Sequence, residues 1–409
     1  MKKVNFILAS VVFISTNIFA LNIDEAVKIG LENSHRLKGS TLNQNVADEL
    51  YKKAQSGYKP TIDLSYSLSD TTQNNPDSDS TPGLASISLG YNLFNGFKDK
   101  YAIEGAKEGF KTSIYQKDAL EADLKLEIQL AYIDFLEKRK TLSTKKEAVE
   151  LVEKTLKDTT AYYNQGLLAK NSLLETKVSL SKTVQDKLIA KSELLIAREV
   201  LNRLLGGNIL PNEDIEEIEF ELKDVAGVKE LIKTGLQNRS EIKAMNSTIK
   251  ETISAYNASK SDLYPKVDVK LSHTQADDYM YDDQSIASLN ISYNLYQGGA
   301  NEANRAVSMY KTRIAQEKLE TLKLDTILQI ERAKEAYNLS LENRKVTKDG
   351  KEFAEENFSI MENRYKSQLE KTTDFLNARL SLSEARIAHI KSLYYIYSQH
   401  AKLLRVTQE

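Results

Sequence analysis

Four stretches of the chain alternate between apolar and polar residues with a period of two. They lie within residues 61–70, 86–93, 267–271 and 289–295. This period is typical of a β-strand with one apolar and one polar face. The residues expected on the apolar face include Ile62, Leu64, Leu89, Tyr91, Val269, Ile291 and Tyr293. The chain therefore has the pattern of two strand pairs, with polar loops at residues 71–82 and 277–284.

Two settings fit these strands: an apolar face turned to lipid, or soluble hairpins packed on helices. Aromatic residues gather at the strand ends, as they do at a membrane–water boundary; they are Tyr58, Tyr91, Phe94, Phe97, Tyr264, Tyr293 and Tyr296. A strand that spans a membrane must belong to a closed barrel, because an open edge leaves backbone groups unpaired in lipid. About eight strands are the practical minimum for a barrel, so four strands would have to be pooled between two or three copies of the chain.

The remaining sequence predicts helices that are too long for a compact domain. Residues 97–163 contain no proline and carry heptad-like apolar positions, which predicts a helix of about 100 Å. Residues 301–365 repeat this pattern, and residues 172–205 and 373–405 are expected to return as shorter helices. The first returning helix has two rows of seven-spaced leucines; they are Leu173, Leu180, Leu194 and Leu201, and beside them Leu174, Leu188 and Leu195. Two adjacent rows allow packing on both sides, as in a closed ring of helices.

An internal duplication organises the chain. Residues 23–38 resemble residues 228–243 at an offset of 205, and residues 85–96 match residues 287–298 at six of twelve positions. Fixed-offset similarity of this kind indicates a repeated structural unit. The predicted division is a signal peptide, a first repeat, a connector and a second repeat, at residues 1–20, 21–205, 206–227 and 228–409.

The first twenty residues have the pattern of a secretory signal peptide. Lys2 and Lys3 precede an apolar stretch, and Ala20 offers a small residue before a cut at Leu21. Removal of the two lysines leaves 54 basic and 58 acidic residues, and this balance gives no support to a nucleic-acid partner. No later segment is apolar enough for a membrane-spanning helix.

The sequence lacks the motifs of known enzyme active sites. The chain has no cysteine, and its four histidines lack the spacing of metal ligands. No phosphate loop, zinc-protease motif or nucleophile elbow occurs. We therefore expect a protein without catalytic residues, cofactor or bound metal.

The signal peptide, the duplicated helix–hairpin–long-helix unit and the strand end YNLFNG or YNLYQG running into a helix resemble the TolC-like outer-membrane factor family. The resemblance covers nearly the whole mature chain. It implies a homotrimer in the bacterial outer membrane, with a twelve-stranded β-barrel and a barrel of α-helices that extends into the periplasm. The resemblance also implies a passive exit duct of a tripartite efflux or type I secretion system, with a periplasmic adaptor and an inner-membrane transporter as partners.

The same resemblance indicates which residues form the periplasmic tip of the duct. In similar proteins the second helix-to-helix break holds a tyrosine, a basic residue and two aspartates that restrict the opening. Here Tyr365 and Asp374 match the tyrosine and the first aspartate, while Glu370 stands at the basic position and Asn377 at the second aspartate. Gly166 matches the turn glycine of the first break.

Two other classes of protein share features with this sequence. A periplasmic or surface coiled-coil scaffold would share the long helices, and a periplasmic adaptor would need a small β-domain between its helices, which the sequence does not show. Drugs, metals and polypeptides all remain open as the exported substrate.

Overall fold

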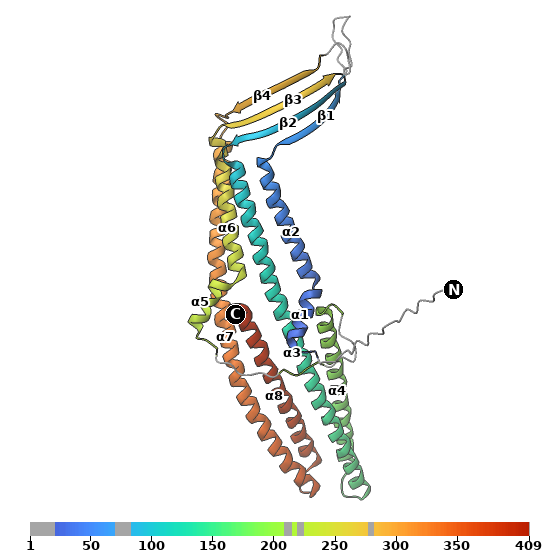
Figure 1. Cartoon of the computed structure of the whole chain (residues 1–409). Coiled ribbons are helices and arrows are strands. Elements are labelled where there is room, and N and C mark those ends of the chain that lie inside the picture. Colours follow the sequence, from blue (N-terminus) through green and yellow to red (C-terminus); the bar gives the residue numbers. More distant parts are fainter. Residues whose placement is uncertain (1–20, 70–82, 208–214, 219–224, 277–281, 409) are drawn as a thin grey trace, which may run out of the picture. The chain divides into compact units, whose positions relative to one another are not determined.

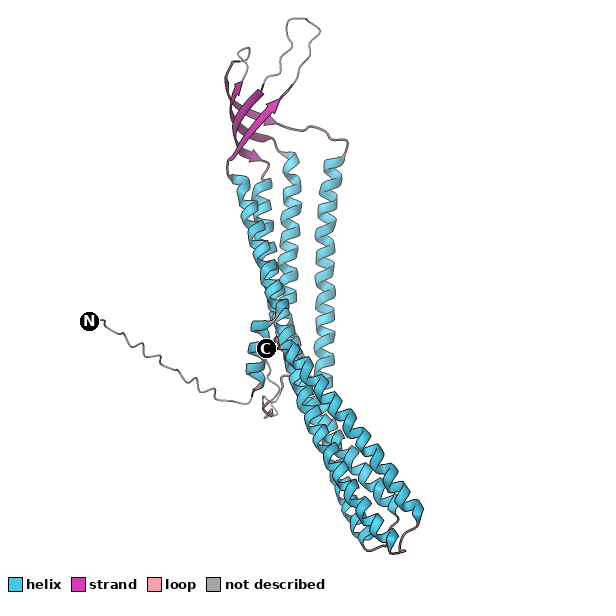
Figure 2. Cartoon of the chain, turned by 90° about the vertical axis from the view of Figure 1, so that its right-hand side faces the viewer, coloured by secondary structure: helices cyan, strands magenta, loops and turns pink. Residues whose placement is uncertain are grey.

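The computed structural model describes residues 21–69, 83–207, 215–218, 225–276 and 282–408. The expected signal peptide, the loop at 71–82, the first part of the loop at 277–284 and much of the connector, including Pro211, lie outside the described residues. Most of the described chain is helical, and one small sheet completes it (Figure 2).

The elements follow one another as two similar series, and Figure 1 labels the α-helices and the strands. They are α1 (Ile23–Asn33), α2 (His35–Gln55), η1 (Ser56–Tyr58), β1 (Thr61–Leu68), β2 (Gly83–Asn95), α3 (Lys98–Asn164) and α4 (Lys170–Leu204), and then α5 (Val228–Asn238), α6 (Ser240–Ala258), η2 (Ser259–Leu263), β3 (Lys266–Ala276), β4 (Gln284–Ser292), α7 (Ala300–Lys366) and α8 (Thr372–Thr407). The four expected long helices are confirmed by α3, α4, α7 and α8, with ends within a few residues of the predicted ones.

The chain forms two compact units, and each contains segments from both predicted repeats. One unit comprises the described residues within Met1–Ser34, Leu124–Asp224 and Leu339–Ala401; the other comprises the described residues within His35–Asp123, Val225–Asn338 and Lys402–Glu409. These units group residues by their contacts in space, whereas the predicted repeats divide the chain by sequence similarity. The division into repeats therefore stays a prediction.

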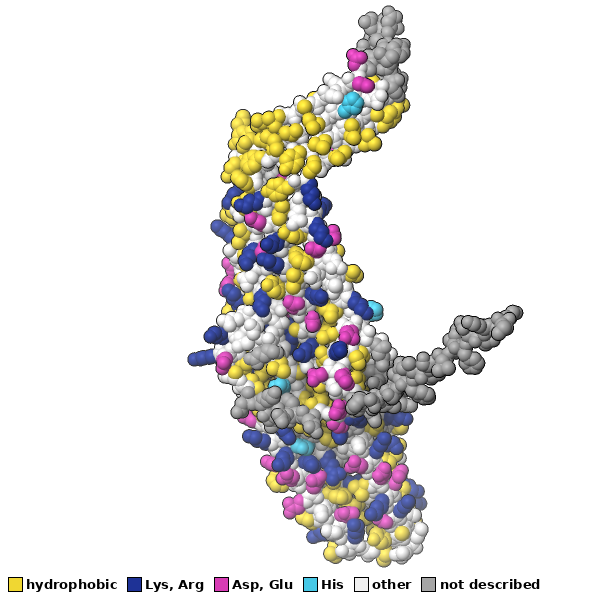
Figure 3. All heavy atoms as spheres, in the orientation of Figure 1, with side chains coloured by type: hydrophobic (Ala, Val, Ile, Leu, Met, Phe, Trp, Pro, Cys, Tyr) yellow, Lys and Arg dark blue, Asp and Glu magenta, His cyan; other side chains and the backbone are white. Residues whose placement is uncertain are grey.

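The sheet belongs to the second of these units and is antiparallel throughout, with the strand order β1-β2-β3-β4. Leu89 of β2 lies opposite Ile62 of β1 and Leu271 of β3, so the apolar positions of neighbouring strands meet on one face. Between Asn92 and Phe94 of β2 the register shifts by one residue, which is a β-bulge. Hydrophobic side chains gather over the sheet in the space-filling view (Figure 3).

One expected strand is shorter than predicted. The alternation of residues 289–295 predicted a strand that includes Tyr293 and Leu295, but β4 ends at Ser292. The corresponding strand of the first repeat continues to Asn95, because β3 pairs with it as far as Lys266. β4 has no strand on its outer side in the described chain, so its last residues lack a partner there.

Each unit contains a short helix that packs closely on a long helix through a glycine, and this glycine stands at the same position in both repeats. In the first unit Gly30 of α1 is buried, and an added Cβ would press on the Ile128 side chain of α3 and lie 3.2 Å from the Leu204 carbonyl oxygen. In the second unit an added Cβ on Gly235 of α5 would lie 2.5 Å from Cδ1 of Ile330. Each short helix therefore approaches a long helix closely because it has no side chain at this position.

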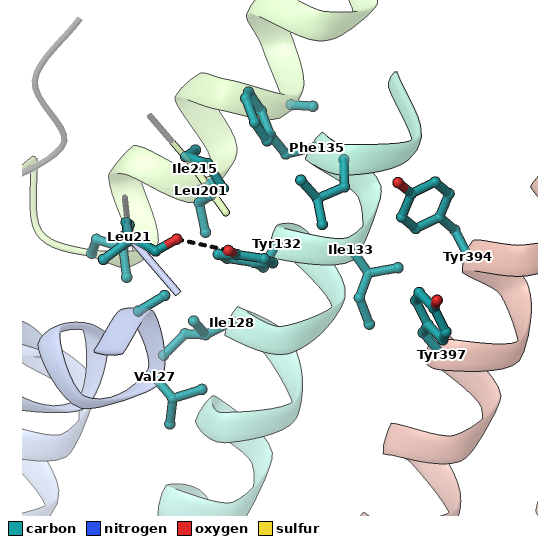
Figure 4. Packing of buried hydrophobic residues seen from close by; sticks show 14 residues of the cluster. Leu21, Val27, Ile128, Tyr132, Ile133, Phe135, Leu201, Ile215, Tyr394 and Tyr397 are labelled. Atoms are coloured by element: carbon teal, nitrogen blue, oxygen red, sulfur yellow. Dashed lines mark hydrogen bonds between the residues drawn. The ribbon is translucent and has the colours of Figure 1, made fainter. Parts of the chain in front are cut away.

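The core of the first unit surrounds Tyr132 of α3 (Figure 4). Ile128, Tyr132 and Phe135 are buried on one face of this helix. The Tyr132 hydroxyl oxygen lies 2.7 Å from the carbonyl oxygens of both Leu21 and Glu216, and burial raises the pKa of this phenol. Because Leu21 also bridges to Ile215 as a short parallel pair, α3 holds two distant chain segments together.

An ion-pair network fixes the end of α8 within the second unit. Glu241 of α6 accepts hydrogen bonds from Arg239 at 3.1 Å and from Arg405 at 2.6 Å. Burial alone would raise the pKa of Glu241, but these two guanidinium groups outweigh it and lower the pKa to about 2. None of the helices in the described part of the chain is both long and apolar enough to cross a membrane.

Candidate functional site

The turn between α3 and α4 ends a helix with a glycine in the left-handed region. Gly166 has φ +78, its N–H donates to the Tyr163 carbonyl, and the Leu167 N–H donates to the Tyr162 carbonyl. These two bonds define a Schellman motif, in which glycine is favoured because it has no Cβ. Gly166 is exposed and no atom lies near an added Cβ, so backbone conformation alone explains the glycine at this position.

The turn between α7 and α8 has the same backbone with a different residue. Gln368 has φ +60 and donates to the Tyr365 carbonyl, and the Leu369 N–H donates to the Arg364 carbonyl. The second turn thus has a glutamine where the first has a glycine, and this glutamine adopts the left-handed conformation. A non-glycine residue is strained in that region.

Glu370 occupies the position where the resemblance predicted a basic residue. Its carboxylate lies 2.8 Å from Nε of Arg364, which is in the last turn of α7. This hydrogen bond lowers the pKa of Glu370. The turn therefore does contain a cation, although sequence position alone did not locate it. Arg364 compensates the charge of Glu370, and Asp374 is an exposed acid in the first turn of α8.

The side chain of Tyr365 is buried, with 5% of its surface exposed. Its hydroxyl lies 2.9 Å from Oγ1 of Thr159 on α3. Thr159 Oγ1 in turn donates to the Thr155 carbonyl, which leaves the Tyr365 hydroxyl as the donor between the two. The Tyr365 ring stacks on Phe375 at 4.6 Å, and Tyr162 meets it edge-on. Tyr365 thus ties the ends of α3, α7 and α8 together.

The structure brings only part of the expected tip together. Tyr365, Glu370 and Asp374 lie within one turn region, while Asn377 is an exposed residue of α8 one helical turn further on. Sequence reasoning missed Thr159, Phe375 and Arg364. A threonine within a long helix and a phenylalanine among other apolar residues carry no distinguishing pattern, so no local signal was available for the first two.

A groove lies beside this region, between α3, α4 and α8, with a volume of about 510 Å³. Leu174 and Val178 of α4 and Leu380 of α8 are exposed along it. Arg379 is 6% exposed, and burial lowers its pKa to about 10. Its Nη2 reaches Ser179 Oγ at 3.4 Å, but its Nη1 has no hydrogen-bond partner among the described residues. The groove thus combines exposed apolar side chains with the buried guanidinium of Arg379 and the carboxylates of Glu175 and Asp186 in its lining.

The expected apolar positions of the strands share one face of the sheet. Ile62 lies opposite Leu89, Tyr91 opposite Val269, and Ile291 opposite Val267. Leu64 is on the same face, opposite Ile87, whereas Tyr293 lies one residue beyond β4. On the other face Asn290 donates to Asp268 at 3.0 Å, which gives a polar surface.

The returning helix α4 keeps one of its two leucine rows covered. Leu201 is fully buried and Leu194 is half-buried, whereas Leu174, Leu188 and Leu195 are exposed. No described residue of the chain therefore covers the second row. Such an exposed row is expected of a helix that packs on a second helix through this face.

The fold and the sheet define an outer-membrane channel protein. The sequence profile of the outer membrane efflux protein family matches residues 27–207 and 231–407, and the chain belongs to this family. It is an exit duct of the bacterial outer membrane and not an enzyme. A curated relative is Outer membrane protein TolC of Salmonella enteritidis, 23% identical over 389 residues that cover 90% of this chain and 78% of that protein.

Solved structures share this fold at low sequence identity. A membrane protein from Pseudomonas aeruginosa superposes with a TM-score of 0.85 at 16% identity, covering 94% of this chain and 90% of that one. The CmeC outer membrane channel of Campylobacter jejuni gives 0.84 at 16% identity, with 94% and 85% covered. The MtrE outer membrane channel of Neisseria gonorrhoeae gives 0.80 at 16% identity, with 94% and 88% covered. Membership of this family rules out the alternative of a coiled-coil scaffold.

Proposed function

We propose that three copies of the chain assemble into one exit duct that works with a periplasmic adaptor and an inner-membrane transporter. Each copy would contribute four strands to a closed twelve-stranded barrel. The unpaired outer edges of β1 and β4 support this assembly, because open edges in lipid leave backbone groups unsatisfied. The exposed leucine row of α4 supports a matching ring of helices.

The groove beside the second turn is the surface we assign to the adaptor. Its apolar walls suit the apolar face of a partner helix, as in other helix-in-groove complexes. The buried Arg379 side chain lines this groove, so the shape of the proposed adaptor surface depends on it. Arg379→Gln keeps a polar side chain of similar length and should weaken adaptor binding without loss of assembly.

The second turn is proposed as the constriction of the duct. In a threefold assembly, three Asp374 carboxylates would face one lumen, and like charges in a constriction attract cations and repel anions. The pore should therefore be cation-selective, of low conductance, and blocked from the periplasmic side by multivalent cations. Buried Tyr365, bonded to Thr159, would hold the turn in its closed position.

The test of this constriction is the reversal potential in planar bilayers under a salt gradient. Asp374→Asn should shift the potential toward a less cation-selective value while the assembly persists. Adding Glu370→Gln should shift it further, because Arg364 then loses its counter-charge. Asp349→Asn, which removes an exposed carboxylate of α7 away from the turn, is the matched control. An equal shift in the control, or no shift in the double variant, would place the filter elsewhere.

A further inference from the structure

A hollow lies on the apolar face of the sheet, over which hydrophobic side chains gather in Figure 3. Its volume is about 490 Å³, which is within the range of small-molecule sites. Two rows of side chains that cross the strands border it. The row nearer the helices includes Leu89, Leu271 and Ala287, and the row farther from them includes Ile87, His273 and Ser285.

The face changes from apolar to polar at the second of these rows. His273 and Ser285 lie opposite each other, and Nδ1 of His273 is 2.9 Å from Oγ of Ser285. Gln275 and Asp283 stand two positions further toward the strand ends, and both are exposed. When the serine hydroxyl donates to Nδ1, the histidine proton is on Nε2, and Nε2 has no hydrogen-bond partner among the described residues.

The depth of His273 in the membrane follows from the aromatic cluster at the helix end of the sheet. Phe94, Phe97 and Tyr264 form this cluster, with ring centroids 5.1, 6.3 and 5.4 Å apart, and such rings gather at membrane–water boundaries. His273 stands nine residues after Tyr264 on extended backbone, which is about 31 Å along the strand. At the usual tilt of about 35–45° this rise is about 22–25 Å, close to the height of about 25 Å of the apolar band. His273 therefore lies at the opposite boundary of the hydrocarbon in the closed barrel proposed above.

We propose that the hollow binds one acyl chain of a membrane lipid, and that His273 donates a hydrogen bond from Nε2 to the carbonyl oxygen at the head of this chain. The site rests on the barrel proposed above, which turns the apolar face toward lipid. A donor at the edge of the hydrocarbon is costly without an acceptor, and the ester carbonyls of lipids lie at this level. The chain packs on Leu271, and Ala287 leaves room for it because its methyl group stands beside the larger side chains of the same row.

The charges around the hollow favour a neutral carbonyl over a headgroup phosphate. Asp283 stands two positions from Ser285, about 7 Å further toward the strand end, where the phosphate of a bound lipid would lie. Like charges repel each other at this distance. The described residues that line the hollow include no lysine or arginine that could compensate a phosphate. The recognised group is therefore the carbonyl oxygen of an ester-linked chain.

The number of lipid molecules that stay bound to the purified assembly tests the site. The protein is reconstituted in vesicles of a diester phosphatidylcholine and extracted in mild detergent, and the bound lipids are counted by native mass spectrometry. Ala287→Leu fills the hollow and should lower the count several-fold relative to wild type. Ala85→Leu is the matched control, because it makes the same change at an exposed position of the same face, opposite Tyr66 and outside the hollow. An equal count in wild type and Ala287→Leu would overturn the site.

Lipids with and without the carbonyl test the hydrogen bond. A diether phosphatidylcholine has the same headgroup and chains but no ester carbonyl. Wild type should retain the diester lipid about two- to tenfold better, which is the range of one net hydrogen bond. His273→Leu should lose this preference, whereas His273→Gln keeps an amide donor and should keep part of it. Equal retention of the two lipids by wild type would overturn the assigned acceptor.

Failure of this site and failure of the duct give different results. A wild type that assembles in vesicles and conducts ions but retains no lipid, or only detergent, would overturn the lipid site and leave the duct intact. A chain that does not insert into vesicles would contradict the barrel itself. Ala287→Leu and His273→Leu both put an apolar side chain on the apolar face, so assembly should persist in each.

Discussion

Gly30→Ala should destabilise the protein, whereas Gly39→Ala should stabilise it, although both glycines lie within helices. Alanine is favoured over glycine in a helix by about 1 kcal/mol, and at Gly39 no atom lies within 4 Å of the new Cβ. At Gly30 the same Cβ presses on the Ile128 side chain and lies 3.2 Å from the Leu204 carbonyl oxygen. Overpacking of this kind costs about 1–3 kcal/mol, so the net change at Gly30 is a loss of up to about 2 kcal/mol.

The measurement is the midpoint of thermal unfolding, followed by helical circular dichroism at one fixed scan rate. A change of 1 kcal/mol corresponds to about 2–4 °C for a unit of 150–250 residues. Ile128→Val removes the methyl group nearest to the added Cβ, so it should recover part of the loss when combined with Gly30→Ala. If Gly30→Ala raises the midpoint as Gly39→Ala does, α1 does not approach α3 as described.

Two further changes test the sheet and the second turn. Ile291→Arg puts a charge on the apolar face and should cost about 2–4 kcal/mol per copy near the bilayer midplane, so the yield of assembled protein should fall; Asn290→Arg, on the polar face, should assemble as wild type does, and equal yields would refute the assigned faces. Tyr365→Phe keeps the ring stacked on Phe375 but removes a hydrogen bond worth about 1 kcal/mol, so single-channel conductance should rise while assembly persists; an unchanged conductance would exclude the Thr159 bond as a restraint on the turn.

The sequence was sufficient for elements whose pattern is local. Alternation located the strands and heptad-like spacing located the long helices, because both patterns follow from the side-chain periods of the backbone. The end of β4 was predicted wrongly: the alternation continues past Ser292, but a strand also needs a partner, which Tyr293 lacks in the described chain.

The details of the candidate site could not be predicted in this way. The Tyr365–Thr159 bond joins residues 206 positions apart, and Arg379 is buried by helices that pack only in the folded unit. The compensation of Glu370 by Arg364 depends on the shape of the turn between them. Each of these contacts depends on tertiary packing. Tertiary packing leaves no periodic pattern in a single sequence, so these contacts could not be predicted from it.

The divergence of the two turns bears on how many partners one duct can hold. Arg379 is buried beside the groove, but its counterpart in the first repeat, Lys177, is an exposed residue of α4. A ring built from three copies would thus present six similar helix turns of two chemical kinds in alternation. A partner that requires the buried guanidinium has three equivalent sites, and a second partner molecule per copy would have to recognise a different surface. With the groove assigned to the adaptor as proposed, this difference between the two halves of the chain predicts three such adaptor sites per duct.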